Sequence, residues 1–462
     1  MLLLKTLLTK KPVIEKQKPV DVYVPDKKRI EENLSEMVQI QTISTEDDRY
    51  IDNMYKMHDY VLKRFENIAK VCTLTDYNGG MMIKWQGKTE HKKPLVLMSH
   101  LDVVPAMGKW DKDAFSGEIK DGVIWGRGTV DTKGPLSAEL EAVDSLIKEG
   151  FRPEQDVYIL SSSREEIGGC DVPNMVKDFE EQGIVPAIVL DEGGAIMDGV
   201  MPGMKGRYAM VAHSERASVQ ILVKAAKLPK KKAPALRIAM FTEALSKAKI
   251  GKRGFPPIVE DMFTTLAPYM PFFLKYLFCN LKIFKGLLVK VLPKVSAEAT
   301  AMIGATIGFT HPKDEYTKDF VIGETATVVN LMFTPFVDEK ECIRDIEEIA
   351  EKFDLETEIV KVRPTPPAEK LNTDAYKFVK SVNERVFDDV VTAPFALFGG
   401  TDARHFIGKA DAVLRYAPIY ISKDEFKTFH NPNERISCES VYGAVKFYRE
   451  FIVSYKKFDK QA

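Results

Sequence analysis

Three apolar runs, each followed at once by acidic or histidine residues, constrain the fold of this chain more than any other feature. The first covers residues 94–99 and shows no alternation of polar and apolar side chains, which is typical of a strand buried on both faces of an α/β sheet. His100 and Asp102 follow this run. Ligands of open α/β sheets bind beyond the carboxyl ends of the strands, so both side chains are candidate functional groups.

The other two apolar runs repeat this arrangement. Residues 156–162 end just before Glu165 and Glu166, and residues 186–190 end directly before Asp191. Parallel strands bring their carboxyl ends to the same edge of a sheet. We therefore expect the acidic side chains that follow these runs to lie at one edge.

A further carboxylate, Asp131, lies in a loop interrupted by glycines, residues 126–134, which leads into a helical pattern from about Pro135. Glycines allow the backbone to approach a ligand closely. The sequence thus predicts a cluster with more acidic than basic groups, and such a cluster is stable mainly when metal ions neutralise it. Its members are His100, Asp131, Glu166 and Asp191.

Six segments of the chain together resemble the motifs of a known enzyme family. They read SHLDVVP, GRGTVDTKG, SSREEIGG, LDEGG, FGGTDARHF and FHNPNERIS. The resemblance is to the aminoacylase, carboxypeptidase S and succinyl-diaminopimelate desuccinylase family of dinuclear zinc hydrolases. It runs from about residue 26 to the C-terminus and is closest to the carboxypeptidase S branch, which includes hydrolases of N-fatty-acyl amino acids.

The resemblance implies an α/β fold with a mostly parallel-sheet, phosphorylase/hydrolase-like catalytic domain and an inserted α+β lid that serves in dimerisation. The residue pattern agrees, because strands and helices alternate up to about residue 212 and a half-exposed strand then begins at residue 218. The expected parts are an N-terminal extension (1–25), a first catalytic part (26–213), the lid (214–366) and a second catalytic part (367–462).

The resemblance also implies two zinc ions and assigns their ligands. His100 and Asp191 would hold one ion, Glu166 and His430 the other, and Asp131 would bridge the pair. Imidazole and carboxylate ligands suit zinc, and cobalt or manganese would fit similar sites.

By the same resemblance, Asp102 would orient the neighbouring imidazole, and Glu165 would be the general base that takes a proton from the attacking water. Three residues would form the substrate site. Gly399 and Gly400 precede an expected helix start whose backbone N–H groups can hold an anion, and Arg404 adds a charged fork.

The expected lid lacks three features of the family. The motif Gly-His-Ser/Ala, whose histidine stabilises the oxyanion, is replaced by residues 225–233, which contain no histidine. A segment Asn-Val-Ile-Pro has become residues 319–323, and Met332 stands where an arginine is usual. His213 and His311 are the remaining histidines on the lid side, but neither lies in the expected motif.

Two function classes stay open on these grounds. The first is a metal-dependent hydrolase, of exopeptidase or aminoacylase type, that cleaves an amide next to a free carboxylate in an N-acyl amino acid or small peptide. The second is a metal-binding relative with weak or no hydrolysis. Losing one oxyanion donor costs about 10²–10³ in rate, which leaves a two-metal site with substantial catalysis and favours the enzyme.

The charges of the chain nearly cancel, with 66 lysines and arginines against 67 aspartates and glutamates. This balance argues against nucleic acid as a partner. The five cysteines are few, widely spaced and odd in number, which argues for reduced thiols and a cytoplasmic protein.

Residues 271–292 are unusually apolar, and their lysines fall on one side of a helical wheel. This pattern predicts an amphipathic helix with a break at Gly286. Three interpretations stay open: packing against the lid or a second subunit, a wall for a substrate's acyl chain, or peripheral contact with membrane lipid. Residues 1–8 are too short for a membrane span and predict an untethered or loosely amphipathic start.

Overall fold

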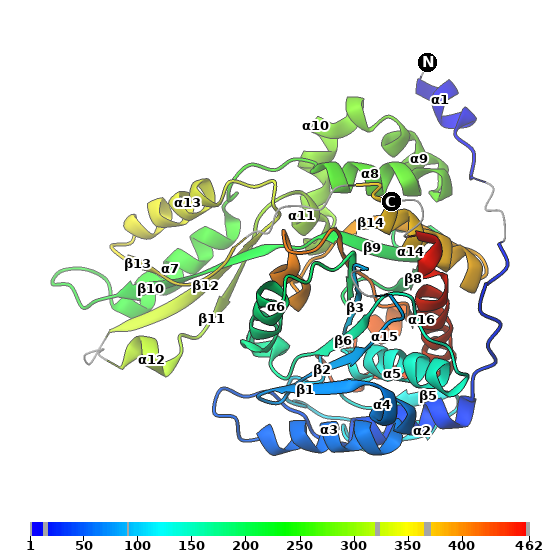
Figure 1. Cartoon of the computed structure of the whole chain (residues 1–462). Helices are drawn as coiled ribbons and strands as arrows, with labels where there is room; N and C mark the ends of the chain where they lie inside the picture. Colours follow the sequence, from blue (N-terminus) through cyan, green and yellow to red (C-terminus); the bar gives the residue numbers. More distant parts are fainter. Residues whose placement is uncertain (1, 13–16, 90–91, 319–323, 365–370, 459–462) are drawn as a thin grey trace.

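The computed structural model of the chain describes residues 2–12, 17–89, 92–318, 324–364 and 371–458 (Figure 1). The departure from the family at residues 319–323 lies outside the described residues. Within the described ranges, strands form sheets of ten, four and three members. The ten-stranded and four-stranded sheets lie in two distinct parts of the molecule (Figure 1).

The ten-stranded sheet has the order β1-β2-β6-β3-β7-β15-β9-β8-β16, and β14 pairs with β9. The central pairs β6·β3, β3·β7 and β7·β15 are parallel, whereas β1 and β2 extend one side as antiparallel strands. The mostly parallel centre confirms the predicted α/β class. The strands are β1 (Thr73–Tyr77), β2 (Gly80–Trp85), β3 (Leu95–Met98), β6 (Val157–Ser161), β7 (Ile188–Asp191), β8 (Ile196–Asp198), β9 (Arg207–Ser214), β14 (Val390–Ala396), β15 (Val413–Arg415) and β16 (Tyr420–Ile421).

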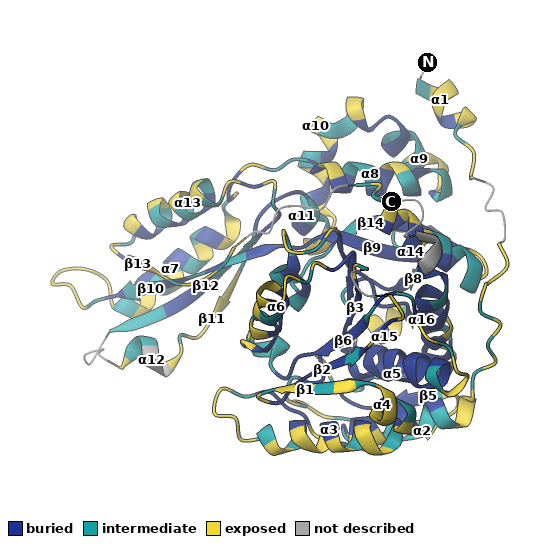
Figure 2. Ribbon diagram, viewed as in Figure 1, coloured by how far each residue is buried: buried dark blue, intermediate teal, exposed yellow. Residues whose placement is uncertain are grey.

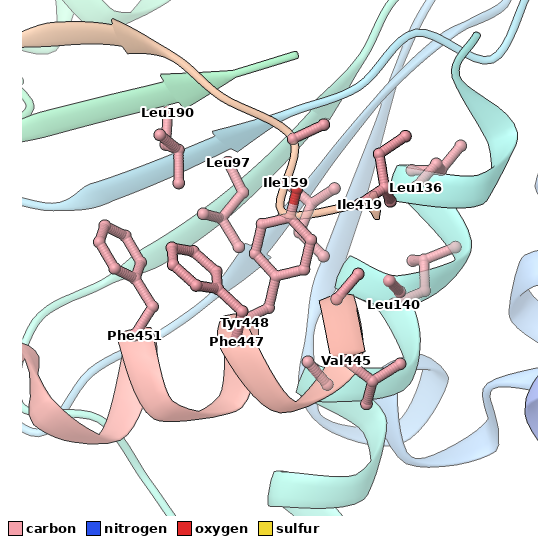
Figure 3. Packing of buried hydrophobic residues seen from close by; sticks show 14 of the residues in the cluster. Leu97, Leu136, Leu140, Ile159, Leu190, Ile419, Val445, Phe447, Tyr448 and Phe451 are labelled. Carbon is pink, nitrogen blue, oxygen red and sulfur yellow. The ribbon is translucent and has the colours of Figure 1, made fainter. Parts of the chain in front are cut away.

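Helices bury this sheet on both faces, which explains why its central strands are uniformly apolar. Leu97 packs in one cluster with α5 and α16, whereas its neighbour Val96 packs in another with α6. Figure 3 shows the first layer, where Leu97, Ile159 and Leu190 from three strands face α5 and α16. The helices of this part are α2 (Lys27–Gln39), α3 (Ile51–Arg64), α4 (Glu66–Val71), α5 (Lys133–Lys148), α6 (Asp171–Glu181), α14 (Asp374–Val386), α15 (Lys423–Phe426) and α16 (Cys438–Phe458).

The four-stranded sheet is antiparallel, with the order β11-β12-β10-β13. Helices α7 and α13 share a hydrophobic cluster with it, while its outer strand β13 is largely exposed (Figure 2). One covered and one solvated face explain the alternating pattern of its sequence. The elements are β10 (Ala217–Ala225), α7 (Pro234–Lys247), β11 (Thr306–Thr310), α12 (Asp314–Thr317), β12 (Thr325–Phe333), α13 (Glu339–Glu351) and β13 (Glu356–Arg363).

Only Glu215 and Arg216 separate β9 of the large sheet from β10 of the small one. Glu215 accepts hydrogen bonds from the Thr401 amide (3.1 Å) and from Nε of Arg415 (2.9 Å), both in the larger part. Arg216 donates through Nη2 to the Met332 carbonyl (2.6 Å) in the small sheet. The connection between β9 and β10 is thus held by two adjacent side chains, Glu215 bonded to the larger part and Arg216 bonded to the small sheet.

A layer of short helices lies between α7 and β11 in the chain and packs mainly on β9 and β14 of the large sheet. The predicted break at Gly286 is wrong, because the helix is interrupted at Asn280 instead. The Asn280 side chain donates to the carbonyl of Tyr276 (2.8 Å), which competes with backbone bonding in the next turn. The elements are α8 (Pro257–Leu266), η2 (Ala267–Tyr269), α9 (Phe272–Cys279), α10 (Leu281–Val291), η3 (Leu292–Lys294) and α11 (Ala297–Ile303).

The N-terminal residues form a helix, α1 (Leu2–Leu8), and the prediction of an untethered start is wrong. Asn280 of α9's C-cap donates to the buried Oγ1 of Thr6 (3.1 Å), and Lys275 donates to the carbonyl of Thr9. These polar bonds hold α1 against α9, as Figure 1 shows at the top of the molecule. In the described part of the chain, no helix has the length and apolar character needed to cross a membrane.

A third sheet joins β17 (Arg435–Ser437), β5 (Val123–Trp125) and β4 (Ile119–Lys120). It pairs a strand from the end of the chain with strands from its first third. This pairing brings the loop before β17 close to the loop after β5.

Candidate metal centre and active site

The ends of the central strands bring the predicted metal ligands to one edge of the large sheet. His100 follows β3, Glu166 lies in the 3-10 turn η1 (Glu165–Ile167) after β6, and Asp191 is the last residue of β7. Asp131 comes from the loop between β5 and α5, and His430 from the loop between α15 and β17. Segments far apart in the sequence thus meet at one place.

Four of the five predicted ligands make direct contacts around Asp131. Nε2 of His100 lies 2.9 Å from Oδ1 of Asp131, and Nε2 of His430 lies 2.7 Å from Oδ2. His430 also lies 3.3 Å from Oε1 of Glu166. Ligand atoms of His100, Asp131 and Glu166 all lie within 4.8 Å of one another. Asp131 presents one oxygen to each imidazole, the arrangement that a carboxylate bridging two ions requires.

The fifth predicted ligand, Asp191, stands outside this group of three converging side chains. Its carboxylate accepts hydrogen bonds from the amides of Glu192 (2.8 Å) and Ala403 (2.8 Å). It nevertheless borders the same small hollow as His100 and Glu165. The two amides therefore fix Asp191 at the margin of the cluster, on the side of His100.

The pKa shifts in the cluster reflect its excess of carboxylates over positive charges. Burial raises the pKa of Glu166, and the charge of Asp131 raises it further. Burial opposes ionisation of Asp131 as well, but hydrogen bonds from both imidazoles hold its pKa below the usual range. Contacts with Asp131 and Glu166 raise the pKa of His430 to about 10. Two imidazoles and two carboxylates at these distances form a donor set that fits zinc or a similar divalent ion.

Two acidic side chains beside the cluster, Glu192 and Asp402, were missed from the sequence. Burial raises the pKa of Glu192 well above its usual value, and the neighbouring Asp191 adds to the rise. Burial raises the pKa of Asp402 to about 7. Both stand inside motifs that the sequence pointed to, but a motif does not reveal which of its carboxylates face the cluster.

Asp102 lies against His100 and the turn η1. Nδ1 of His100 is 2.9 Å from the backbone carbonyl oxygen of Asp102 and 3.3 Å from its carboxylate. The same carboxylate accepts hydrogen bonds from the amides of Glu165 (3.1 Å) and Glu166 (3.2 Å). One fully buried side chain thus orients the imidazole and the turn that carries both glutamates.

Glu434, which was also missed, holds the loop that presents Asp131. Its buried carboxylate pairs with Arg127 (2.6 Å) and accepts hydrogen bonds from the amides of Val130 (2.9 Å) and Asp131 (3.2 Å). Glu434 follows His430 by only four residues, yet Val130 lies 304 residues away in the sequence. In the sequence, only the closeness of Glu434 to His430 pointed to a role at the site. Its contact with the loop that carries Asp131 could not be predicted from the sequence.

A cavity of about 440 Å³ opens beside the cluster, between η1, β13 of the small sheet and the 3-10 turn η4 (Asp402–Phe406). We call it the cationic cavity, because Lys361, Arg363 and Arg404 line it. Glu165 lines it too and also borders the hollow beside His100. Glu165 therefore lies between the cationic cavity and the candidate metal ligands.

Arg404 keeps its place in the cavity wall through Glu215 and Gly400. Its guanidinium pairs with one oxygen of Glu215, whose other oxygen pairs with Arg415 (2.9 Å). A single carboxylate thus serves two guanidinium groups. A Cβ on Gly400 would lie 1.7 Å from Nη2 of Arg404, so the absence of a side chain there lets the guanidinium lie against the backbone.

The predicted anion-binding loop around Gly399 already holds anions of the chain itself. The Thr401 amide donates to Glu215 (3.1 Å), and the Ala403 amide donates to Asp191 (2.8 Å). The carbonyl of Gly399 accepts a hydrogen bond from the Arg216 amide (3.2 Å). Of this loop and the turn that follows it, Thr401, Asp402 and Arg404 line the cationic cavity, whereas Gly399 and Gly400 do not.

Lys361 and Arg363 were not predicted as site residues. They lie on β13, whose exposed pattern in the sequence resembles an ordinary solvated strand. Burial and the charge of Arg363 lower the pKa of Lys361. His405 also lines the cavity, and burial together with Arg404 lowers its pKa to about 4, so it is neutral at pH 7.

Neither of the two histidines considered for the lid lines the cationic cavity. The ring of His213 packs against that of Tyr376, with centroids 4.8 Å apart, and His311 is exposed. Residues 271–292 also contribute no side chain to its described lining. This arrangement disfavours the interpretation that they form a wall for an acyl chain in this cavity.

Comparison with known proteins identifies a family and several relatives that match most of the chain. The protein family described as peptidase family M20/M25/M40 matches residues 96–454. The N-fatty-acyl-amino acid synthase/hydrolase PM20D1 of Xenopus tropicalis is 29% identical over 441 residues, which cover 92% of this chain and 86% of the relative. Probable carboxypeptidase S-like 2 of Dictyostelium discoideum is 26% identical over 430 residues, which cover 90% and 82%.

A solved structure shares the fold. The M20 family metallo-carboxypeptidase Sso-CP2 from Sulfolobus solfataricus superimposes with a TM-score of 0.67 at 18% identity, covering 93% of this chain and 99% of that chain. The arrangement of two sheets described above therefore recurs in a distant sequence.

Proposed function

Because the chain belongs to peptidase family M20/M25/M40, we propose that it hydrolyses an amide bond next to a free carboxylate, with two divalent metal ions as cofactors. The observation that carries this proposal is the cationic cavity directly beside Glu165. The substrates would be N-acyl amino acids or short peptides. The relative from Xenopus tropicalis is named as an N-fatty-acyl-amino acid synthase/hydrolase and that from Dictyostelium discoideum as a probable carboxypeptidase S-like protein, which supports this substrate class.

Five residues would hold the ions. His100 and Asp191 would bind one, Glu166 and His430 the other, and Asp131 would contact both. The contacts of Asp131 with both imidazoles support the bridging assignment. Bound there, zinc, cobalt or manganese would lower the pKa of a water molecule and polarise the amide carbonyl.

Glu165 would accept the proton of the attacking water and return it to the leaving amine. Its position between the cavity and the hollow beside His100 supports this role. Burial raises its pKa well above the usual value, which suits a carboxyl group that carries a proton during part of the reaction. Asp102 would act through its neighbours, by holding His100 and the backbone of Glu165 in place.

Arg404 and Arg363 would bind the free carboxylate of the substrate. Arg404 shares the single carboxylate of Glu215 with Arg415, so the group carries more positive than negative charge. A guanidinium fork matches a carboxylate in geometry as well as in charge. This requirement would distinguish an amide with a neighbouring carboxylate from one without it.

The alternative of a relative with weak or no hydrolysis rests on the missing lid histidine. The candidate metal ligands and Glu165 are all present, which supports the hydrolase instead. The cysteines, which are few, widely spaced and odd in number, support the proposal of a reducing, cytoplasmic setting. Dimerisation through the four-stranded sheet remains part of the proposal.

Matched substrate pairs test the proposal. Zinc-loaded protein is assayed on N-acyl amino acids and dipeptides, each beside the analogue whose carboxylate is a carboxamide. We expect the carboxylate form to react about 10- to 100-fold faster in kcat/KM, because a hydrogen bond to a charged group contributes about 1.5–3 kcal/mol. Glu165→Gln protein serves as a control for contaminating hydrolases. Equal rates within each pair would contradict the carboxylate site, and no turnover of any pair would favour the weakly hydrolytic alternative.

A further inference from the structure

Helix α1 has an unusual orientation at the surface of the molecule. Its one buried residue is the polar Thr6, which bonds to Asn280, while leucines such as Leu4 and Leu8 are exposed to 59% and 66%. A helix of a water-soluble domain normally buries its apolar side and exposes its polar side. The polar contact thus fixes α1 with four of its five leucines exposed, namely Leu3, Leu4, Leu7 and Leu8.

The neighbouring helices α9 and α10 continue this apolar character. Phe273 at the start of α9 is 70% exposed. On α10, Ile283, Leu287 and Val291 recur every four residues and form an exposed stripe. Figure 2 shows exposed residues on the outer side of α1 and α10, at the end of the molecule away from α2 and α3. Helix α9 contacts both α1 and α10, so these exposed apolar residues lie on adjoining helices. Exposed apolar residues gathered in this way are typical of an interaction site.

Residues 2–11 and 271–296, which include α1, α9, α10 and η3, are also rich in lysine. We call them the lysine-leucine surface. Residues 2–11 and 271–296 contain eight lysines and neither aspartate nor glutamate, although the whole chain is balanced in charge. Lys275 bonds to the carbonyl of Thr9 and Lys285 pairs with Glu260. Others, such as Lys282 and Lys290 beside the apolar stripe of α10, are exposed.

We propose that the lysine-leucine surface docks on the surface of an anionic phospholipid bilayer. The leucines of α1, Phe273 and the stripe of α10 would enter the boundary of the acyl chains, and the lysines would contact the phosphate groups. Basic amphipathic helices bind lipid interfaces through this combination of apolar area and positive charge. The helices α1, α9 and α10 have 7, 8 and 11 residues, so each is too short to span a bilayer.

The positive charge of the lysine-leucine surface argues against a second copy of the chain as its binding partner. Two such surfaces brought face to face would oppose lysine to lysine, with no acidic residue within 2–11 or 271–296 to pair with them. An anionic lipid surface supplies the missing negative charge. The proposal does not depend on the hydrolytic function, because the residues of this surface do not line the cationic cavity.

Vesicle binding of the full-length protein tests the proposal. The protein is sedimented with vesicles of phosphatidylcholine alone or of phosphatidylcholine with phosphatidylserine. We expect binding only to the vesicles with phosphatidylserine, weakened by added salt. Lys282→Gln with Lys290→Gln should lower the partition coefficient roughly 25-fold, at about fivefold for each lysine. Leu4→Ser with Phe273→Ser should also weaken binding.

Matched controls separate this outcome from misfolding and from the hydrolytic proposal. Lys63→Gln with Lys148→Gln removes two exposed lysines elsewhere and should leave binding unchanged. All variants must match the parent in thermal melting. Glu165→Gln protein should bind vesicles like the parent whether or not the parent hydrolyses amides.

Two results would overturn the proposal. One is equal or absent binding to both kinds of vesicle. The other is self-association of the parent in sedimentation velocity that Leu4→Ser with Phe273→Ser abolishes, which would assign the surface to a second copy of the chain.

Discussion

Nε2 of His430 lies 2.7 Å from Oδ2 of Asp131, although 299 residues separate the two in the sequence. The contact joins the loop before β17 to the loop before α5, and Glu434 reinforces it by binding the backbone of Asp131. Closing so long a loop costs conformational entropy. The candidate metal centre can therefore form only when these two distant loops have come together.

Metal content is the first test of this centre. We expect about two divalent ions per chain after loading with zinc, and a lower melting temperature after chelation, because the ions offset repulsion among buried carboxylates. Asp131→Ala should lose both ions, since this residue would contact each. Elemental analysis and thermal melting provide the measurements. A stoichiometry of one in fully loaded, folded protein would contradict the bridging role of Asp131.

Glu165→Gln should separate proton transfer from metal binding. We expect both ions to remain and kcat to fall about 10²–10⁴-fold, the usual contribution of general acid-base catalysis. Steady-state kinetics and elemental analysis on the same sample give the two readouts. Wild-type turnover in this variant would show that another group accepts the proton.

Arg363→Gln should raise KM for substrates with a free carboxylate. We expect kcat/KM to fall about 10- to 100-fold for these substrates and little for their carboxamide analogues, because a charge-assisted hydrogen bond is lost. Arg49→Gln, which removes an exposed guanidinium paired with Asp47, is the matched control. An equal loss for both kinds of substrate would point to a structural role for Arg363.

Gly400→Ala should displace Arg404, because the new Cβ would lie 1.7 Å from its guanidinium. We expect a loss of kcat/KM comparable to that of Arg404→Gln, with unchanged metal content. Gly399→Ala is a close control, since no atom lies within 4 Å of a Cβ built there. If both glycine variants behave alike, the close packing of Arg404 on Gly400 does not matter for function.

The dependence of stability on pH should reveal the protonation of Glu139. Ser99 donates to its carboxyl group (2.9 Å), and burial raises its pKa from 4.5 to about 8. Between these values the folded chain holds a proton that the unfolded chain has lost. The free energy of unfolding should therefore fall as pH rises through this window, by up to about 1.4 kcal/mol per pH unit.

Glu139→Gln should reduce that fall, as measured by urea unfolding at several pH values with metal content held constant. Glu181→Gln changes a largely exposed side chain and should keep the slope of the parent. Identical slopes in all three proteins would mean that Glu139 is charged in the folded state.

Much of the fold was predictable from the sequence because it depends on local patterns. β3 (Leu95–Met98) and its parallel neighbours are apolar throughout, since helices cover both faces, and this signal is carried by consecutive residues. The clustering of His100, Asp131 and Glu166 followed from the rule that parallel strands end at one edge, together with the family resemblance.

The features that were missed depend on contacts between distant segments. Arg363 reaches the cavity only because the four-stranded sheet lies beside η1. The sequence pattern of β13 does not indicate that η1 lies next to it. The break at Asn280 and the anchoring of α1 share one cause, a side-chain amide bonded to Thr6 and Tyr276. A helical wheel cannot register such a bond.

The joint between the two sheets has a mechanical consequence. Arg216 is bonded to the small sheet, while its neighbour Glu215 holds the guanidinium of Arg404, and Arg363 approaches the same cavity from β13. If the small sheet pivots about this joint, Arg363 moves with it and the backbone next to Glu215 must turn. The angle between the sheets would then set the spacing of the two guanidinium groups, so that closure and recognition of the carboxylate become a single event.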